Sequence, residues 1–467
     1  MMNLKSCKRS FFTLTSAVIL ITSLALSGCV YYLPEETGNT GAINTGADEK
    51  EKANSSAEDT GAEDIAAEDP GASNKNAGDI DGDTGESEMS GNNADDAAGH
   101  GSVEFAKKLK LGWNLGNTLD AFDDNKVFAD DLKTENCWGN PTTTKEMIDY
   151  LRDQGFTTVR IPVTWHPHLE DPDINSGSGI RINEAWLKRV KEVVDYCIED
   201  DLYVIINIHH DNSKEYYYPD TEHREQSLRY VEAVWKTVAE CFKDYDEHLI
   251  FESLNEPRLV GTIYEWKMNY FADECLDAEK IINESNQLFV DTVRASGGKN
   301  AERYLLIPGY DASSIPIQSK NFLIPRDTTE GKLMIEVHAY VPYSFALQEL
   351  SSAETNRYFD PEKSSSTYQI DDLGKTLDEK FLSKGVGVVV DEFGARNKKD
   401  NDKDRSAYYK YFIETMGSYG IPCCIWDNGI ASSDNEQFGI VNRRELSWYF
   451  PGVAESIMSA GREGYGN

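Results

Sequence analysis

The sequence predicts an α/β protein, a (β/α)8 TIM barrel preceded by a disordered acidic linker. Eight short runs rich in Val, Ile, Leu and aromatic residues alternate with amphipathic helical patterns through most of the chain. Polar residues follow many of these runs, as they do at the strand ends that form the functional face of a barrel. No glycine-rich phosphate-binding fingerprint follows any run, which disfavours an open nucleotide-binding sheet.

The predicted strands and helices can be placed along the chain. Helices are predicted between most of the strands. One runs from 183 to 200, and another begins at the threonines 142–144 and ends at Gly155. The connection between the fifth and sixth strands has the weakest helical pattern and is predicted to be mostly loop. The strands are predicted to end near Asn114, Pro162, His209, Asn255, Pro308, Tyr340, Glu392 and Asp427.

Composition divides the chain into three parts. Residues 1–28 join a basic start to an apolar run too short for a membrane span, which predicts an export signal. Residues 29–101 are predicted to be a disordered acidic linker, because between Pro34 and Gly99 they contain no aromatic residue and no cysteine. Residues 102–467 hold all eight tryptophans and are predicted to form one domain.

The segment Leu26-Ser27-Gly28-Cys29 resembles the lipobox of bacterial lipoproteins. By that resemblance, cleavage leaves Cys29 as an acylated first residue, and the exported protein is held at the cell surface by its lipid. An ordinary signal peptide with a coincidental cysteine is the alternative. The net charge of −35 argues against nucleic acid or an anionic lipid surface as a partner, so the membrane is expected to be contacted only through this anchor.

Of the eight cysteines, all but Cys7 and Cys29 lie in the predicted domain. Export permits disulfides among them, but the sequence does not choose between the possible pairings. Cys197 and Cys241 fall in helical patterns and are expected to be buried thiols. A monomer is expected.

Two glutamates follow apolar, strand-like runs. Asn255-Glu256-Pro257 follows one run, and Glu392 follows the run 386–390. Because the carboxyl ends of barrel strands line one cleft, the two carboxyl groups are expected to meet there. Two such groups are the minimum equipment for cleaving a glycosidic bond, since one protonates the leaving oxygen while the other attacks the sugar carbon.

Around these glutamates the chain resembles glycoside hydrolase family 5, and within it the broad-specificity endo-β-1,4-glucanases of subfamily 4. The blocks that carry the resemblance are Gly112–Leu119, Val159–Trp165, His209–Asp211, Asn255–Arg258, His338–Tyr340, Glu392–Gly394 and Trp426–Gly429. The resemblance implies that Glu256 is the acid/base, that Glu392 is the nucleophile and that the anomeric configuration is retained. Retention requires the two carboxyl groups to lie about 5–5.5 Å apart.

The resemblance also implies supporting roles. Asn255 would bind the 2-hydroxyl of the reacting sugar, Tyr340 would donate to Glu392, and His338 would contact Glu256. Arg160 is expected beside Glu392, where its charge keeps that carboxylate ionised. The pKa of Glu256 is expected to be raised so that this residue carries a proton.

Sugar contacts are expected from residues near the strand ends. Trp426 is expected beneath the sugar at the cleavage point, because aromatic faces bury the apolar surface of a pyranose. His209 and His210 would both lie near the sugar if their strand has ended, whereas one would be a core residue if it has not. Asn117 and Asp120 are expected to bind more distant sugars, and Trp138 and Trp165 are candidates for further platforms. The helical patterns place Trp186, Trp235 and Trp266 in the core.

Two alternatives concern the chemistry of the site. His166 and His168 have the spacing of metal ligands, but they flank Pro167 in a loop, so neither a metal nor a cofactor is expected. Asp391 stands where relatives in the family commonly carry a small residue. If it points outward it changes nothing, whereas if it leans toward Glu392 the repulsion between like charges raises a pKa.

The predicted substrate is a β-glucan such as cellulose, mixed-linkage glucan or xyloglucan. Hydrolysis of β-1,4-mannan or xylan on the same scaffold stays open, because specificity depends on the loops. A surface glycan-binding lipoprotein without catalysis is a more distant alternative. It would require a missing catalytic group, whereas Glu256, Glu392, Arg160 and Asn255 are all present.

Overall fold

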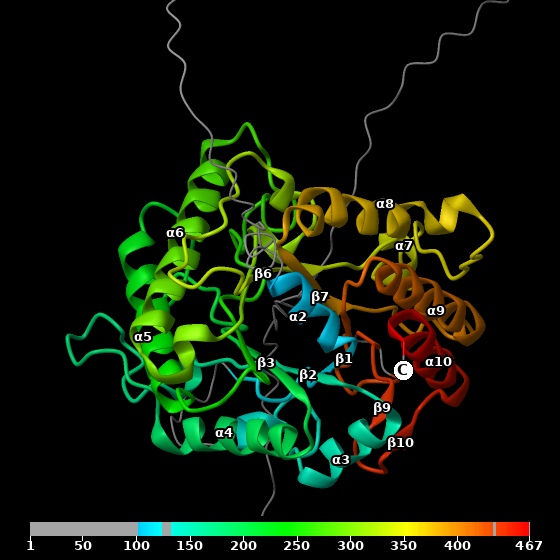
Figure 1. Ribbon diagram of the computed structural model, residues 1–467, viewed down its shortest axis with the longest axis horizontal. Coiled ribbons are helices and arrows are strands. Elements are labelled where there is room, and N and C mark those ends of the chain that lie inside the picture. Colours follow the sequence, from blue (N-terminus) through cyan, green and yellow to red (C-terminus); the bar gives the residue numbers. More distant parts are fainter. Residues whose placement is uncertain (1–100, 124–131, 433–435, 467) are drawn as a thin grey trace, which may run out of the picture. The chain divides into compact units, whose positions relative to one another are not determined.

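The computed structural model describes residues 101–123, 132–432 and 436–466, so the predicted export signal, Cys29 and the linker to residue 100 lie outside the described residues. Eight parallel strands, paired in chain order, form a closed barrel in which β8 returns to β1 (Figure 1). The predicted (β/α)8 barrel is therefore confirmed. Its strands are β1 (Leu111–Asn114), β2 (Thr158–Ile161), β3 (Tyr203–Asn207), β4 (Leu249–Glu252), β5 (Leu305–Ile307), β6 (Leu333–His338), β7 (Gly387–Phe393) and β8 (Cys423–Ile425).

Helices surround the barrel and link its strands (Figure 1). They are α3 (Lys145–Gln154), α4 (Glu184–Glu199), α5 (Arg224–Cys241), α6 (Asp273–Ala295), α8 (Ser364–Lys380), α9 (Asp402–Ser418) and α10 (Pro451–Tyr465). Between β5 and β6 there are only the 3-10 turns η4 (Tyr310–Ala312) and η5 (Pro316–Gln318), as predicted. Other connections hold α7 (Tyr343–Ala346), η1 (Leu132–Asn136), η2 (His166–His168), η3 (Gly298–Glu302), η6 (Leu382–Lys384) and the paired strands β9 (Val441–Asn442) and β10 (Ser447–Trp448). None of the helices in the described part of the chain is long and apolar enough to cross a bilayer.

The predicted helix ends agree with the structure better than the predicted strand ends. Thr144 caps α3 by accepting a hydrogen bond from the backbone of Met147, and Gly155 ends this helix at a φ of 109°. Asn183 caps α4 in the same way. In contrast, β3, β4, β6 and β8 end two or three residues before the predicted positions, because the apolar pattern continues beyond the last ladder pair.

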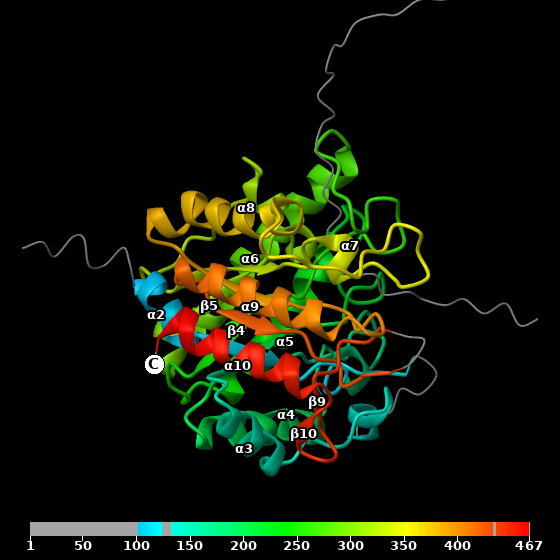
Figure 2. The same ribbon diagram turned by 90° about the vertical axis from the view of Figure 1, so that its right-hand side faces the viewer.

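Residues that face the barrel interior form layers. Helix α2 (Gly101–Leu109) lies at one end, away from α7 (Figure 2), and Phe105 and Leu109 close that end. They contact an apolar layer of Ile205, Ile250, Leu306, Met334, Val389 and Cys424. Farther along the strands the interior becomes polar, with the fully buried side chains of Asn114, Arg160, Asn207, Glu252, Glu336 and Asp391. Catalytic candidates lie beyond this polar layer, so the barrel supports them from beneath.

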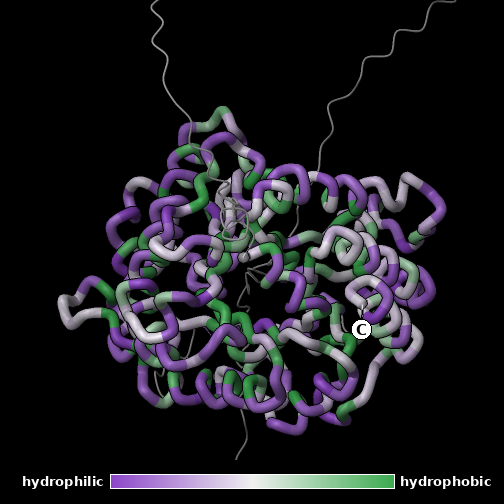
Figure 3. The backbone as a smooth tube through the Cα atoms, viewed as in Figure 1, coloured by the Kyte–Doolittle hydropathy of each residue, from purple (hydrophilic) through white to green (hydrophobic). Residues whose placement is uncertain are grey.

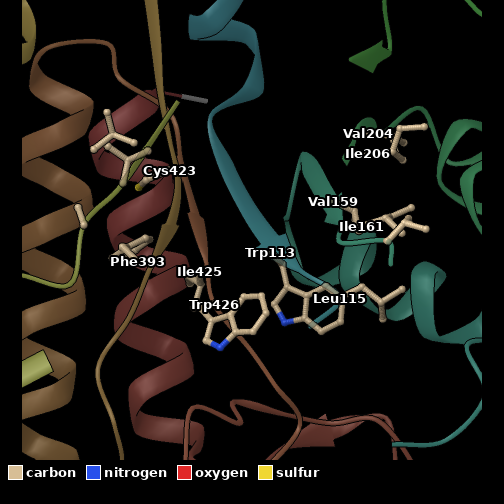
Figure 4. Packing of buried hydrophobic residues seen from close by; sticks show 14 of the residues in the cluster. Trp113, Leu115, Val159, Ile161, Val204, Ile206, Phe393, Cys423, Ile425 and Trp426 are labelled. Carbon is tan, nitrogen blue, oxygen red and sulfur yellow. The ribbon is translucent and has the colours of Figure 1, made fainter. Parts of the chain in front are cut away.

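The alternate residues of the same strands face outward. Val159, Ile161, Val204 and Ile206 belong to the large apolar core between strands and helices (Figure 4). Hydrophobic segments accordingly gather toward the middle of the barrel domain, and hydrophilic ones predominate at its rim (Figure 3). Cys197 is a buried thiol in this core, and Cys241 is a half-buried one at the end of α5.

Strand β7 contains a β-bulge. While β6 advances two residues from Glu336 to His338, its partners on β7 advance three, from Val389 to Glu392. The extra residue lets the neighbours Asp391 and Glu392 both turn into the barrel, whereas a regular strand would turn one of them outward.

Candidate active site

Glu256, His338 and Glu392 meet at the carboxyl ends of β4, β6 and β7. One oxygen of each carboxylate and one ring nitrogen of His338 all lie within 4.8 Å of one another. Glu256 has a φ of 42°, a left-handed conformation that is costly for a residue with a Cβ and is found where function requires it. This spacing suits attack by one carboxylate on a carbon whose leaving oxygen the other protonates.

Glu392 is held from two sides. The Tyr340 hydroxyl donates to its Oε1 at 2.7 Å, and Arg160 Nη1 donates to its Oε2 at 3.1 Å. Both contacts match the predicted geometry. They turn the carboxylate to a fixed orientation, which a nucleophile needs for in-line attack.

Arg160 is held by three side chains besides Glu392. Its Nε and Nη2 each donate to Glu252 at 2.6 Å. Nη1 donates to Asn114 at 3.0 Å, and Nη2 also donates to Asn255 at 2.9 Å. With the bond to Glu392, all five N–H groups of the guanidinium have acceptors. Glu252 was not predicted from the sequence, although an acid at an inward position of an apolar strand is a signal that could have found it.

His338 lies between the two glutamates. Its Nδ1 lies 2.9 Å from Glu256 and 3.3 Å from Glu392. Burial disfavours the charged ring, but the charge of Glu392 and the hydrogen bond with Glu256 outweigh burial and raise the pKa of His338 to about 9.

The surroundings of Glu256 shift its pKa in the direction opposite to the expected one. Burial acts to raise the pKa of Glu256, but the hydrogen bond and charge of His338, with the charge of Arg258, lower it below its ordinary value. Burial raises the pKa of Glu392 above its ordinary value, although the charges of His338 and Arg160 oppose the shift. We expected the higher pKa at Glu256, but the two shifts have the opposite signs, because the protonated imidazole hydrogen-bonds Glu256. Arg258, which also donates to the Glu256 carbonyl, was missed by the sequence reasoning.

His209 and His210 lie beyond the end of β3, so the strand has ended before them, as in the alternative that lets both reach the sugar. Their rings meet edge to face at 4.4 Å. His209 lies nearly parallel to Trp426 at 6.0 Å, and His210 lies 5.5 Å from Trp138. Burial holds the pKa of His209 well below its ordinary value and lowers that of His210 to about 4, so both rings are neutral near pH 7.

The loop after β1 places the other predicted sugar-binding residues. Asp120 is fully buried, and its two oxygens accept the backbone N–H groups of Asn117 and Thr118. It therefore shapes the loop that carries Asn117. One of its oxygens lies within 4.8 Å of a ring nitrogen of His209 and of His210. Trp138 is half-buried and borders a hollow of about 250 Å³ that reaches Gly429 and Tyr449. Direct sugar contact by these residues stays a prediction.

The tryptophan predictions were partly wrong. Trp165 is buried and donates to the Asn207 carbonyl, so it cannot serve as a platform. Trp266 lies outside any helix and is half-buried, with the Arg258 guanidinium 3.8 Å from its ring centre. In contrast, Trp186 and Trp235 are buried core residues, as predicted.

Of the two orientations considered for Asp391, the structure shows the inward one, with the side chain inside the barrel. Its carboxylate oxygens lie 3.7 Å from Arg160 Nε and 3.7 Å from His338 Nε2. Burial and the charge of Glu252 raise the pKa of Asp391 to about 7. The bulge in β7 accounts for this orientation.

Comparison with known proteins gives consistent matches. The family model "Cellulase (glycosyl hydrolase family 5)" matches residues 123–432. Endoglucanase B from Neocallimastix patriciarum is 40% identical over 369 residues, which cover 78% of this chain and 72% of that protein. The structure of a GH5 family lichenase from Caldicellulosiruptor sp. F32 is 42% identical with a TM-score of 0.75, covering 82% of this chain and 100% of that one. A GH5-4 broad specificity endoglucanase from Clostridium longisporum is 38% identical with a TM-score of 0.70, covering 78% and 98%.

Proposed function

Because this chain belongs to glycosyl hydrolase family 5, it is a glycoside hydrolase of the endo-β-1,4-glucanase type, and we propose that Glu256 and Glu392 carry out a retaining double displacement in it. The observation that carries the proposal is the meeting of Glu256, His338 and Glu392 within 4.8 Å. This separation leaves room for a sugar ring to react with both carboxyl groups but too little for the interposed water of an inverting enzyme.

The first displacement begins with a proton shift. His338 Nδ1 gives its proton to Glu256 Oε1 across 2.9 Å, which converts an ion pair into a neutral pair. Exclusion of water by a bound sugar favours this transfer, because a dry site disfavours separated charges. Glu392 then attacks the anomeric carbon, the glycosidic bond breaks, and Glu256 passes the proton to the leaving oxygen.

The second displacement frees the sugar. Glu256, now ionised, takes a proton from a water molecule, and the resulting hydroxide attacks the anomeric carbon and breaks its bond to Glu392. Two inversions give overall retention. Asn255 uses its carbonyl oxygen for Arg160, which leaves its amide N–H groups for the 2-hydroxyl of the reacting sugar.

The substrate proposal covers β-1,4-glucans, with mixed-linkage glucan favoured by the likeness to a lichenase. Trp426 is proposed to support the sugar at the cleavage point, and His209, His210, Asn117 and Trp138 to contact it or its neighbours. Reducing-sugar release should be measured on carboxymethyl cellulose, lichenan, xyloglucan, mannan and xylan. Glucans should be hydrolysed fastest, with a rapid fall in viscosity. Faster hydrolysis of mannan or xylan would overturn the substrate assignment, and binding without products would overturn catalysis.

We further propose that the enzyme is a secreted monomer tethered by lipid at Cys29, with its catalytic domain facing outward. The lipobox-like segment supports the anchor, and the acidic sequence after it suits a soluble spacer. Radiolabelled palmitate should enter the wild-type protein in a bacterial host, and the Cys29→Ala variant should leave the membrane fraction. A labelled or membrane-bound Cys29→Ala protein would contradict the anchor.

A further inference from the structure

Three carboxyl groups lie in the polar layer beneath the proposed catalytic pair. They belong to Glu252 on β4, Glu336 on β6 and Asp391 on β7, and one oxygen of each lies within 4.8 Å of the others. All three side chains are fully buried. Glu252 binds Arg160, whereas neither Glu336 nor Asp391 takes part in the proposed double displacement.

The hydrogen-bond donors around this cluster are already engaged. Glu252 receives two bonds from Arg160 and one from Asn207 at 2.9 Å, and the second amide N–H of Asn207 lies 3.0 Å from His209. Arg160 has no N–H group left. Consistent with this, neither oxygen of Glu336 accepts a hydrogen bond from the residues that the structure describes.

Asp391 is in the same situation. Both of its oxygens lack a hydrogen-bond donor within the described part of the chain, and the nearest cationic nitrogens are 3.7 Å away. A buried ionised carboxylate without a donor costs several kcal/mol by order of magnitude, so such a group takes up a proton instead.

The charges that face Glu336 do not favour its ionisation. The cation that faces it is Arg160 from β2, and the anions are Glu252 from β4 and Asp391 from β7. With all three carboxyl groups of the cluster ionised, three negative charges would face the one positive charge of Arg160 in the core of the barrel.

We propose that Glu336 is held as a neutral carboxylic acid whose O–H donates to the Glu252 carboxylate, and that it is a positioning residue for the nucleophile. The bond keeps Glu252 turned toward Arg160, and the neutrality of Glu336 leaves the Arg160 charge for Glu392. In agreement, burial and the charges of Glu252 and Asp391 raise the pKa of Glu336 well above its ordinary value.

Infrared difference spectroscopy tests the proton directly and without reference to activity. The full-length protein should show, near pH 7, a carbonyl band of a protonated carboxylic acid that shifts in D₂O. The Glu336→Gln variant should lack that band, whereas the bands of other buried acids should persist. Identical spectra for the two proteins would overturn the proposal, whatever the enzyme's substrate proves to be.

Kinetics test the positioning role, which depends on the proposed function. Glu336→Gln keeps a donor for Glu252 and should retain kcat within about threefold of wild type. Glu336→Leu has a side chain of similar size without a donor and should lose about tenfold or more in kcat. KM should change little in either variant. Equal losses in both variants would overturn the role of the donor. A stoichiometric bound metal that disappears in Glu336→Gln would overturn the assignment of a proton to Glu336, because the three carboxylates would then hold a cation.

Discussion

The variant His338→Asn isolates the charge of the imidazole. Asn keeps an N–H group that can reach Glu256, but it cannot hold the proton that His338 shares between the two glutamates. Because the pKa of His338 is about 9 in the folded protein, the shared proton should be lost in wild type only as the pH rises through about 9. That loss defines the expected alkaline limb of activity.

The size of the effect follows from the shift. The surroundings of His338 raise its pKa from the ordinary value of 6.5 to about 9, which corresponds to about 3 kcal/mol of favourable interaction with the charged ring. The stability linked to this shift is fully present below about pH 6.5 and is lost as the pH rises through about 9. In the variant the alkaline limb should depend on Glu256 alone and move down by at least about one unit, because a hydrogen bond to a charged group is worth about 1.5–3 kcal/mol.

Two assays check this prediction. The dependence of kcat/KM on pH, measured with a soluble glucan, should narrow from the alkaline side in His338→Asn. The dependence of the unfolding free energy on pH, measured by urea denaturation, should become flatter between about pH 6.5 and pH 9. An alkaline limb that stays in place or moves upward would refute the claim that the free enzyme stores its proton on His338.

Three further variants follow from the same geometry. Tyr340→Phe removes a hydrogen bond of 2.7 Å to the nucleophile and should lower kcat roughly 10- to 150-fold in steady-state assays; an unchanged kcat would show that this contact is idle. Asp391→Asn should reduce the loss of Tm between about pH 4 and pH 7, because an acid whose folded pKa is raised to about 7 costs stability as the pH climbs through that range; parallel Tm curves would place the titration elsewhere. Gly116→Ala would bring a Cβ within 2.7 Å of the Trp426 ring and should raise KM for polymeric glucan. The control Gly452→Ala, whose Cβ meets nothing within 4 Å, should leave KM unchanged, and equal KM values for both variants would contradict the role of Trp426.

The order of the strands and the meeting of Glu256 with Glu392 could be predicted from the sequence. Each strand is a local pattern, and parallel strands in a closed barrel deliver their carboxyl ends to one face. The partners of Glu392 could also be predicted, because the resemblance placed Arg160 and Tyr340 beside it, and both form hydrogen bonds with it.

Features that depend on several elements at once could not be predicted. The location of the proton requires His338 to lie between two carboxylates that come from other strands. The inward turn of Asp391 requires a bulge that only the pairing of β7 with its neighbours reveals. Trp266 matched a helical pattern, but it lies in the long connection before α6, where its ring contacts Arg258.

Trapping the covalent intermediate tests the central claim most directly. A 2-deoxy-2-fluoro-cellobioside with a good leaving group should inactivate the enzyme, because the fluorine slows both displacements and the leaving group restores the first one. Mass spectrometry of the digested protein should place the added disaccharide on the peptide that contains Glu392, and specifically on its carboxylate. A label on another residue, or turnover with inversion and without any labelled peptide, would contradict the proposed roles of Glu256 and Glu392.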